Sequence, residues 1–278
     1  MKLTGPFQQI VTLNHLPLKG KLNDESLEII TNGGIISDNG KIVETGDYQL
    51  LKQKFPNSEI DLMEGEQIAI PAFVDAHTHI CFGGNRANDF AMRNAGKTYL
   101  EIAESGGGIW SSVQHTRQAS KDDLVNGILE RVNVLLNQGI TTIEIKSGYG
   151  LNVDEELKML RAIKKAQGLT KATLVPTCLS AHLKPRDFEG TSEEYLHYIL
   201  NEILPKVKDE NLAKRVDIFI EKSAFQLEES KNFLLKAKEL GFQITVHADQ
   251  FTAGSSRIAV EVGAKSADHL EATIDEDI

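Results

Sequence analysis

The sequence predicts an α/β protein: a (β/α)8 TIM-type barrel with about six βα units present, preceded by a small β-rich domain. Two observations predict the barrel. From residue 67 onward, short apolar runs alternate with segments of helical period, and this alternation repeats six times. Apolar strands separated by helices are typical of a parallel sheet, and so many repeats favour a barrel over an open sheet. A third observation, a cluster of short β-rich runs, sets residues 1–66 apart as a domain of their own.

The β-rich region begins with strand candidates at residues 7–13 and 27–31. The segment 33–46 reads GGIISDNGKIVETG, two β-rich runs joined through Asn39-Gly40. This dipeptide is the strongest short-range hairpin signal, because both central residues of a type I′ turn need positive φ. Residues 48–54 are expected to form a short helix.

The second region, residues 67–278, carries the alternating elements. Strands are expected at residues 68–79, 141–147, 173–182, 216–221, 244–249 and 264–270, and helices at 121–138, 154–167, 192–206 and 227–239. Asp154 and Ser192 are candidate N-caps, while Gly139, Gly168 and Gly241 follow the ends of helices.

Composition excludes several classes of function. The chain has 278 residues, 41% hydrophobic and 25% charged, which is enough apolar material for a sizeable core. The net charge of −10, without a basic cluster, argues against nucleic acid and anionic membrane surfaces as partners. Cys81 and Cys178 have no paired spacing, and no leader or membrane-spanning run is evident, so a cytoplasmic protein is expected.

Histidines gather where the predicted strands end. Five of the eight histidines occupy such positions: His77, His79, His182, His247 and His269. The carboxyl ends of strands in a parallel barrel are where catalytic groups collect. The other three, at positions 15, 115 and 197, are expected on the surface.

The pair His77 and His79 has the spacing of a metal site. Residues i and i+2 of a strand face the same way, so both imidazoles can approach one ion. Neutral imidazoles suit zinc or iron, and further ligands come from other strands. A lone HxH is as often structural, but three more histidines at matching strand ends favour a metal site. Asp75 and Glu221 are either acceptors for metal ligands or strand-end carboxylates bonded to backbone.

Several long motifs resemble those of a known family. The segment 71–79, PAFVDAHTH, resembles the first-strand signature of the metal-dependent amidohydrolase superfamily. CFGGNRANDF (81–90), ESGGGIWSSVQHTRQAS (104–120), EIKSGYGL (144–151), TCLSAH (177–182) and VHADQF (246–251) are similar to imidazolonepropionases. The resemblance runs from about residue 30 to the end of the chain.

The resemblance implies a metal and a set of site residues. It assigns His77, His79 and His247 to one Zn²⁺ or Fe ion per subunit, completed by an Asp from the last barrel strand. It implies substrate binding by Arg86, Tyr149, His182 and Gln250, and it implies that His269 stands beside the catalytic water. Catalytic roles are expected for His269, His182 and Gln250. Because many relatives carry Glu at position 250, and an amide cannot take a proton as a carboxylate can, Gln250 suits binding better than base catalysis.

The implied reaction is the hydrolytic opening of 4-imidazolone-5-propanoate to N-formimidoyl-L-glutamate, in L-histidine degradation. A metal ion supplies hydroxide near neutral pH, His269 orients water or moves its proton, and His182 donates to the developing oxyanion. Arg86 can grip the propanoate carboxylate bidentately, and Tyr149 can add a hydroxyl donor. The resemblance also suggests a homodimer. The expected binding partner is the small-molecule substrate, with no nucleic acid or membrane.

Two alternatives stay open at this point. One is another metal-dependent cyclic-amide hydrolase or a deaminase. The other is a non-catalytic, C-terminally truncated fragment, because the residues after position 70 are fewer than the ~250 of such a barrel and the last-strand Asp is not found. Asp249 and Asp268 are possible substitutes, but each adjoins a histidine on its strand and is expected to point elsewhere or to need a bend in the chain.

Overall fold

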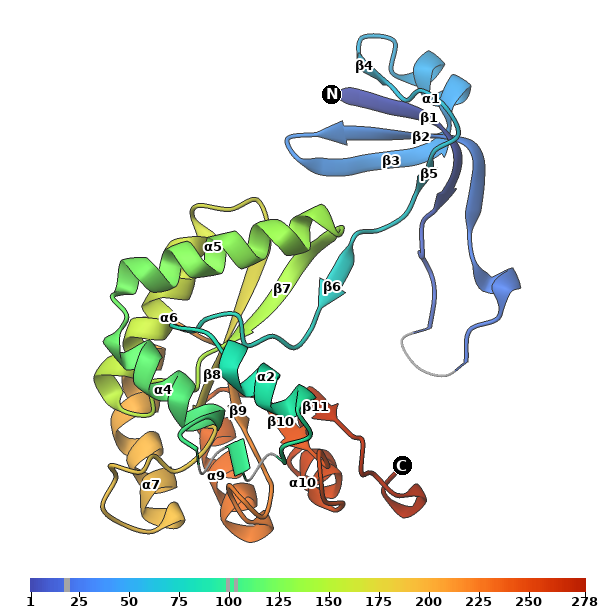
Figure 1. Cartoon of the computed structure of the whole chain (residues 1–278). Coiled ribbons are helices and arrows are strands. Elements are labelled where there is room, and N and C mark those ends of the chain that lie inside the picture. Colours follow the sequence, from blue (N-terminus) through green and yellow to red (C-terminus); the bar gives the residue numbers. More distant parts are fainter. Residues whose placement is uncertain (18–20, 99–100, 103–104) are drawn as a thin grey trace. The chain divides into compact units, whose positions relative to one another are not determined.

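A computed structural model gives the fold of residues 1–17, 21–98, 101–102 and 105–278. The chain divides into two compact units, Met1–Ala72 and Phe73–Ile278. Figure 1 labels their helices and strands. In the described part of the chain, no helix is long and apolar enough to cross a membrane.

The first unit is built on one sheet. Its strands follow the order β3-β2-β1-β4, with β5 also pairing β1: β1 Lys2–Val11, β2 Ile29–Asp38, β3 Lys41–Asp47, β4 Glu59–Leu62 and β5 Ile68–Ala69. The predicted hairpin is confirmed, because β2 and β3 pair antiparallel around Asn39 and Gly40, whose φ angles are 49° and 75°. The predicted helix is confirmed as α1, Tyr48–Lys54, which closes a small core with Leu3 and Ile36.

The second unit is a six-stranded sheet whose strands lie in chain order. These strands are β6 Phe73–Asp75, β7 Ile140–Lys146, β8 Thr173–Ala181, β9 Arg215–Ile218, β10 Gln243–Ala248 and β11 Ser266–His269. Every neighbouring pair is parallel. The sheet curls as part of a barrel does, so the predicted α/β alternation with a parallel sheet is confirmed (Figure 1).

Helices connect these strands and pack on the sheet (Figure 1). They are α2 Ala87–Asn94, α4 Gly108–Gln118, α5 Lys121–Asn137, α6 Val153–Gln167, α7 Ser192–Tyr198, α8 Leu204–Asp209, α9 Leu227–Glu239 and α10 Ser255–Val262, with a π-helical turn at Ile199–Ile203 between α7 and α8. Side chains such as Ile128, Ile143, Leu160 and Val246 are fully buried in their shared core. Gly139 and Gly241 follow α5 and α9 with positive φ, as expected.

Three predicted boundaries are wrong. The strand expected at 68–79 is two short strands in different units, β5 and β6, with Pro71 between them, where proline cannot donate to a sheet ladder. The N-cap of α6 is Asn152 rather than Asp154, because its side chain accepts from the Glu155 amide. Similarly, Thr191 rather than Ser192 caps α7, in a capping box with Glu194.

Candidate metal centre

The carboxyl ends of the parallel strands bring the predicted site residues into one pocket of about 380 Å³. His77 and His79 follow β6, His182 follows β8, and His247 and His269 lie at the ends of β10 and β11. The pocket is lined by all eight residues singled out from the sequence: His77, His79, Arg86, Tyr149, His182, His247, Gln250 and His269. The three remaining histidines are exposed, as predicted.

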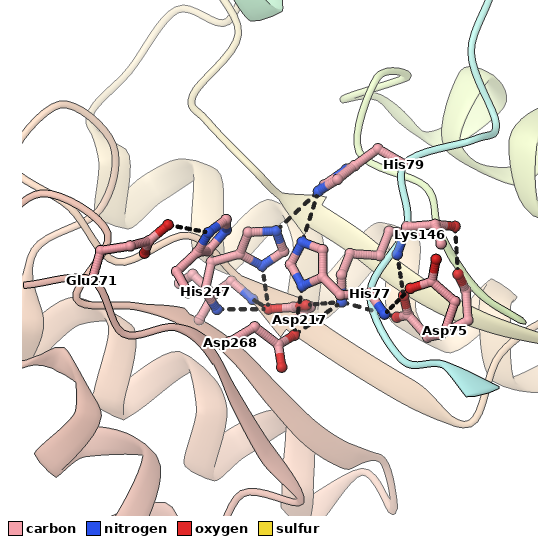
Figure 2. Close-up of polar contacts among 12 residues, drawn as sticks. Asp75, His77, His79, Lys146, Asp217, His247, Asp268 and Glu271 are labelled. Carbon is pink, nitrogen blue, oxygen red and sulfur yellow. Dashed lines mark hydrogen bonds and ion pairs between the residues drawn. The ribbon is translucent and has the colours of Figure 1, made fainter. Parts of the chain in front are cut away.

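Three imidazoles meet at the centre of this pocket. The Nε2 atom of His79 lies 3.2 Å from the Nε2 of His77 and 3.2 Å from the Nε2 of His247 (Figure 2). Together these side chains form a group able to hold a metal ion. Two nitrogens bound to one tetrahedral zinc at 2.0–2.1 Å would lie about 3.4 Å apart. The spacing of the histidine nitrogens therefore fits a shared ion.

The tautomers of these histidines support the same conclusion. His77 Nδ1 lies 2.8 Å from an oxygen of Asp268, and His247 Nδ1 lies 3.1 Å from an oxygen of Asp217. An ionised carboxylate only accepts, so each Nδ1 carries the proton and each Nε2 presents a lone pair. Neutral His79 has one proton and cannot satisfy both contacts well. A cation that accepts all three lone pairs removes the conflict.

Burial keeps several of these imidazoles neutral. Burial, followed by the charges of His182 and His247, lowers the pKa of His79 well below its usual value. Burial and the neighbouring His247 lower the pKa of His182 to about 3. Burial and His247 also lower the pKa of His269. Neutral imidazole is the form that ligates a metal or accepts a proton.

Carboxylates that support the histidines come from two other strands. Asp217 on β9 is fully buried and faces His247, while Asp268 on β11 faces His77 (Figure 2). Burial alone would raise the pKa of Asp217, but His247 and Lys146 outweigh it and hold that pKa well below its ordinary value. A carboxylate on the second nitrogen of a ligating histidine fixes the ring and raises its basicity.

Asp217 and Lys146 were not recognised as site residues from the sequence. Lys146 is fully buried and donates to Asp217 and to Glu144. A signal was present, because Glu144, Lys146 and Asp217 interrupt otherwise apolar strands, and charges buried in a sheet must be paired. The sequence pattern alone does not show which of these charges pair, because that depends on which strands are neighbours in the sheet.

The chain changes direction at the end of β11, next to Asp268. His269 and Leu270 have positive φ angles of 78° and 68°, so the chain turns sharply there. Asp268 contacts His77, and the His269 ring lies 5.0 Å from the His77 ring, centroid to centroid. The chain thus bends here, as one of the two expectations for Asp268 required. The Asp268 carboxylate faces the Nδ1 side of His77, and not the side on which the three Nε2 atoms meet.

Asp249 takes no part in the histidine cluster. Its carboxylate is fully buried and accepts hydrogen bonds from the amides of Ser255 and Ser256 at the start of α10 and from the Thr273 hydroxyl. Its carboxylate therefore holds the first amides of α10 and does not lie among the histidines as a substitute ligand. Glu221 likewise accepts from the amides of Phe251 and Thr252, so it holds the loop that follows Gln250.

A cationic group lies at another part of the pocket wall. Arg86 is partly exposed and its Nε is paired with Asp89 by a short contact. Asp89 also accepts from the Gly108 amide at 2.9 Å, which ties Arg86 to the glycine-rich segment that starts α4. Glu104, the first residue of the predicted motif 104–120, lies outside the described residues.

The loop after β7 places Tyr149 beside His182. Glu156 of α6 is fully buried and accepts from the amides of Gly148, Gly150 and Leu151. His182 Nδ1 lies 3.0 Å from the Gly148 carbonyl oxygen, which only accepts, so this nitrogen carries the proton. Neutral His182 therefore presents an unprotonated Nε2, which is a hydrogen-bond acceptor.

The two cysteines lie in the core rather than at the reacting centre. Cys81 and Cys178 are fully buried. Burial raises the pKa of both thiols, and it raises the pKa of Cys178 to about 12. A thiol held protonated is a poor nucleophile. Asp75 accepts from the His77 amide at 3.3 Å, which agrees with its reading as a strand-end carboxylate bonded to backbone.

Several curated proteins of one name are similar to this chain in sequence. It is 38% identical over 272 residues to "Imidazolonepropionase" of Clostridium tetani, covering 97% of this chain and 65% of that protein. It is 48% identical over 221 residues to the "Imidazolonepropionase" of Myxococcus xanthus, covering 79% of this chain and 52% of that protein. It is 44% identical over 254 residues to the "Imidazolonepropionase" of Bacillus cereus, covering 91% of this chain and 59% of that protein. The chain thus spans about half to two thirds of the length of these relatives. A scan against models of protein families finds no match.

Solved structures share the fold at low sequence identity. Guanine deaminase from C. acetobutylicum, with bound guanine, matches with a TM-score of 0.58 and 14% identity over 90% of this chain and 53% of that one. Atrazine chlorohydrolase from Arthrobacter aurescens TC1, complexed with zinc, matches with a TM-score of 0.55 and 13% identity, over 94% of this chain and 55% of that one.

Proposed function

Because this chain belongs, over the part that it spans, to the imidazolonepropionase family, we propose that its pocket opens the ring of 4-imidazolone-5-propanoate by hydrolysis. The product is N-formimidoyl-L-glutamate, in L-histidine degradation. The meeting of three histidine Nε2 atoms beside Arg86 and Tyr149 carries this proposal, since it joins a metal site to groups that bind an anion.

The proposed cofactor is one Zn²⁺ or Fe ion per subunit, held by His77, His79 and His247. The donor set fits, because neutral imidazole suits both metals and two of the three rings have their tautomers set by carboxylates. Such an ion acts as a Lewis acid that polarises a carbonyl and makes hydroxide available near neutral pH.

Two other histidines have distinct proposed tasks. His269 is held neutral by its lowered pKa, so it can accept a proton from the attacking water and return it to the ring nitrogen that leaves. His182, with its proton on Nδ1, accepts a hydrogen bond from a ring N–H of the substrate and so orients the ring. This role replaces donation to the oxyanion, because neutral His182 has no Nε2 proton to donate.

The substrate's tail accounts for the remaining polar groups. Arg86 is fixed through Nε by Asp89, so its terminal nitrogens can grip the propanoate carboxylate. Tyr149 packs at 5.4 Å from His182, centroid to centroid, and can add its hydroxyl to the ring or the tail. Gln250 lines the same pocket and binds through its amide.

The similarity to imidazolonepropionases also supports proposals about the domains, the oligomeric state and the location of the protein. Residues 67–278 are proposed to form about six βα units of a (β/α)8 amidohydrolase barrel, and residues 1–66 the N-terminal part of a β-sandwich. The TM-scores with amidohydrolase enzymes and the six parallel strands support the barrel. A cytoplasmic homodimer acting on a small molecule, without nucleic acid or membrane partners, completes the proposal.

A spectroscopic assay tests the proposed reaction. Loss of the ultraviolet absorbance of 4-imidazolone-5-propanoate is followed with zinc-loaded protein, beside guanine and a hydantoin as competing substrate classes. We expect turnover of imidazolonepropanoate alone, abolished in His247→Ala and retained in His115→Ala, whose side chain is exposed. Turnover of guanine or the hydantoin instead, or equal activity of the two variants, would overturn the proposal.

A further inference from the structure

A single ammonium group lies behind the histidine cluster. Lys146, the last residue of β7, has no exposed side-chain surface. Its Nζ donates to Asp217 at 2.7 Å and to Glu144 at 2.9 Å, and it lies 3.5 Å from Asp268 (Figure 2). A lysine is buried to this degree only when its charge is fully paired, so the three carboxylates account for its position.

Two of these three carboxylates also contact a histidine of the proposed metal site. Asp217 receives the ammonium on Oδ2 and His247 on Oδ1, at 3.1 Å. Asp268 receives both His77 Nδ1, at 2.8 Å, and the ammonium on Oδ2. The ammonium therefore stands between two carboxylate–histidine pairs that come from different strands. No other charge in the described residues joins the two pairs.

The chemistry of Lys146 excludes direct participation in the reaction. Burial would lower its pKa, but Asp217 and Glu144 outweigh burial and raise it, so the amine stays protonated. A protonated amine has no lone pair with which to ligate a metal or attack a carbonyl. The group of one ammonium and three carboxylates carries two excess negative charges when all are ionised, which a divalent cation at the histidines would balance.

We propose that Lys146 is a positioning residue for the metal site, holding Asp217 and Asp268 so that they fix His247 and His77 at once. The inference rests on the proposed function, since it requires a metal at the three histidines. Without the ammonium, the fully buried carboxylate of Asp217 and the partly buried carboxylate of Asp268 lose a shared donor and repel each other. Two of the three ligating rings then lose their fixed orientation together.

Zinc titration of the whole chain tests this proposal. Lys146→Met keeps the length of the side chain and removes its charge. We expect zinc affinity to fall by about 10-fold to 100-fold, because Asp217 and Asp268, the hydrogen-bonded partners of two ligating histidines, would no longer be held, and loss of such partners usually has an effect of this size. Lys158→Met is the matched control, because Lys158 donates to three backbone carbonyls at the end of α4 and does not contact the cluster. It should bind zinc as the wild type does.

Cobalt supplies a second readout that a merely structural lysine would not change. The visible absorption of bound Co²⁺ reports coordination geometry, and we expect it to change in Lys146→Met but not in Lys158→Met. If Lys146→Met fails to fold, Lys146→Met combined with Glu144→Gln keeps the net charge of the buried group and is titrated in its place. The same loss of affinity is expected, because the donor to Asp217 and Asp268 is still absent.

The outcomes separate this inference from the proposed function. If the wild-type chain binds no zinc, the metal site itself is wrong. If the wild type binds zinc and a folded variant lacking Lys146 binds it equally well with the same cobalt spectrum, the site stands and the role of Lys146 is overturned.

Discussion

The two walls of the pocket are built differently. The histidine wall is supported by fully buried groups, Asp217 and Lys146, on the interior of a parallel sheet. The wall that carries Arg86 stands on a short helix, and the Arg86 side chain is 39% exposed even though it is paired with Asp89. Burial strengthens electrostatic interactions and raises the cost of breaking them. The proposed chemistry therefore depends on groups that the fold holds tightly, and recognition of the substrate's tail on groups that solvent screens.

Removing a ligand from the histidine wall should have the largest effect. His79 Nε2 contacts both other Nε2 atoms, so His79→Ala takes away the central nitrogen of the three. We expect zinc content to fall from one ion per chain to near zero, a greater loss than the 10-fold to 100-fold expected for a supporting partner. Elemental analysis after dialysis measures it, with His197→Ala, an exposed position, as the control. Retained zinc in His79→Ala would place the ion elsewhere.

Breaking the buried support should reduce stability. Asp217→Asn leaves Lys146 and the His247 Nδ1 without a carboxylate, and loss of one partner of a buried pair costs about 3–5 kcal/mol. The pKa of Asp217 is depressed in the fold, so its contribution is present above the unfolded value near pH 4 and is lost as pH falls further. Denaturant unfolding without metal should show a constant deficit between pH 5 and 8 that shrinks below pH 4. A deficit under 1 kcal/mol at pH 7 would contradict the account.

Substitution on the exposed wall should affect binding and leave the metal in place. Arg86→Met removes a charged donor worth about 1.5–3 kcal/mol, so KM for imidazolonepropanoate should rise about 10-fold to 100-fold while zinc content stays the same. Arg93→Met, on the same helix and exposed, should leave KM unchanged. A lost metal in Arg86→Met would show that the two walls are not separate in function, and an unchanged KM would show that Arg86 does not bind the substrate.

The residues that line the pocket could be predicted from the sequence more fully than the buried charged residues that hold them in place. The HxH pair, the strand-end histidines and Arg86 were found from spacing and motifs, and the structure gathers all of them in one pocket. Asp217 and Lys146 were missed, because the pairing of charged side chains across β7, β9 and β11 depends on strand order and register. Neither can be read from local sequence patterns. The turn after Asp268 has positive φ at two non-glycine residues, His269 and Leu270, and no local sequence signal predicts such a turn.

Strand lengths show a similar limit. The apolar run 68–79 predicted one strand, yet it divides between two units, and His77 and His79 follow β6 instead of lying in it. Strand periodicity therefore does not by itself account for the convergence of the two rings. Their backbone is instead held beside β7, where the Lys146 amide donates to the Thr78 carbonyl at 3.0 Å.

X-ray absorption spectroscopy of the zinc-loaded chain identifies the atoms that hold the ion. We expect one zinc per chain with three imidazole nitrogens at about 2.0–2.1 Å and no sulfur in the coordination shell. An ion with fewer than three imidazole ligands, or with a thiolate from Cys81 or Cys178, would contradict the site built from His77, His79 and His247.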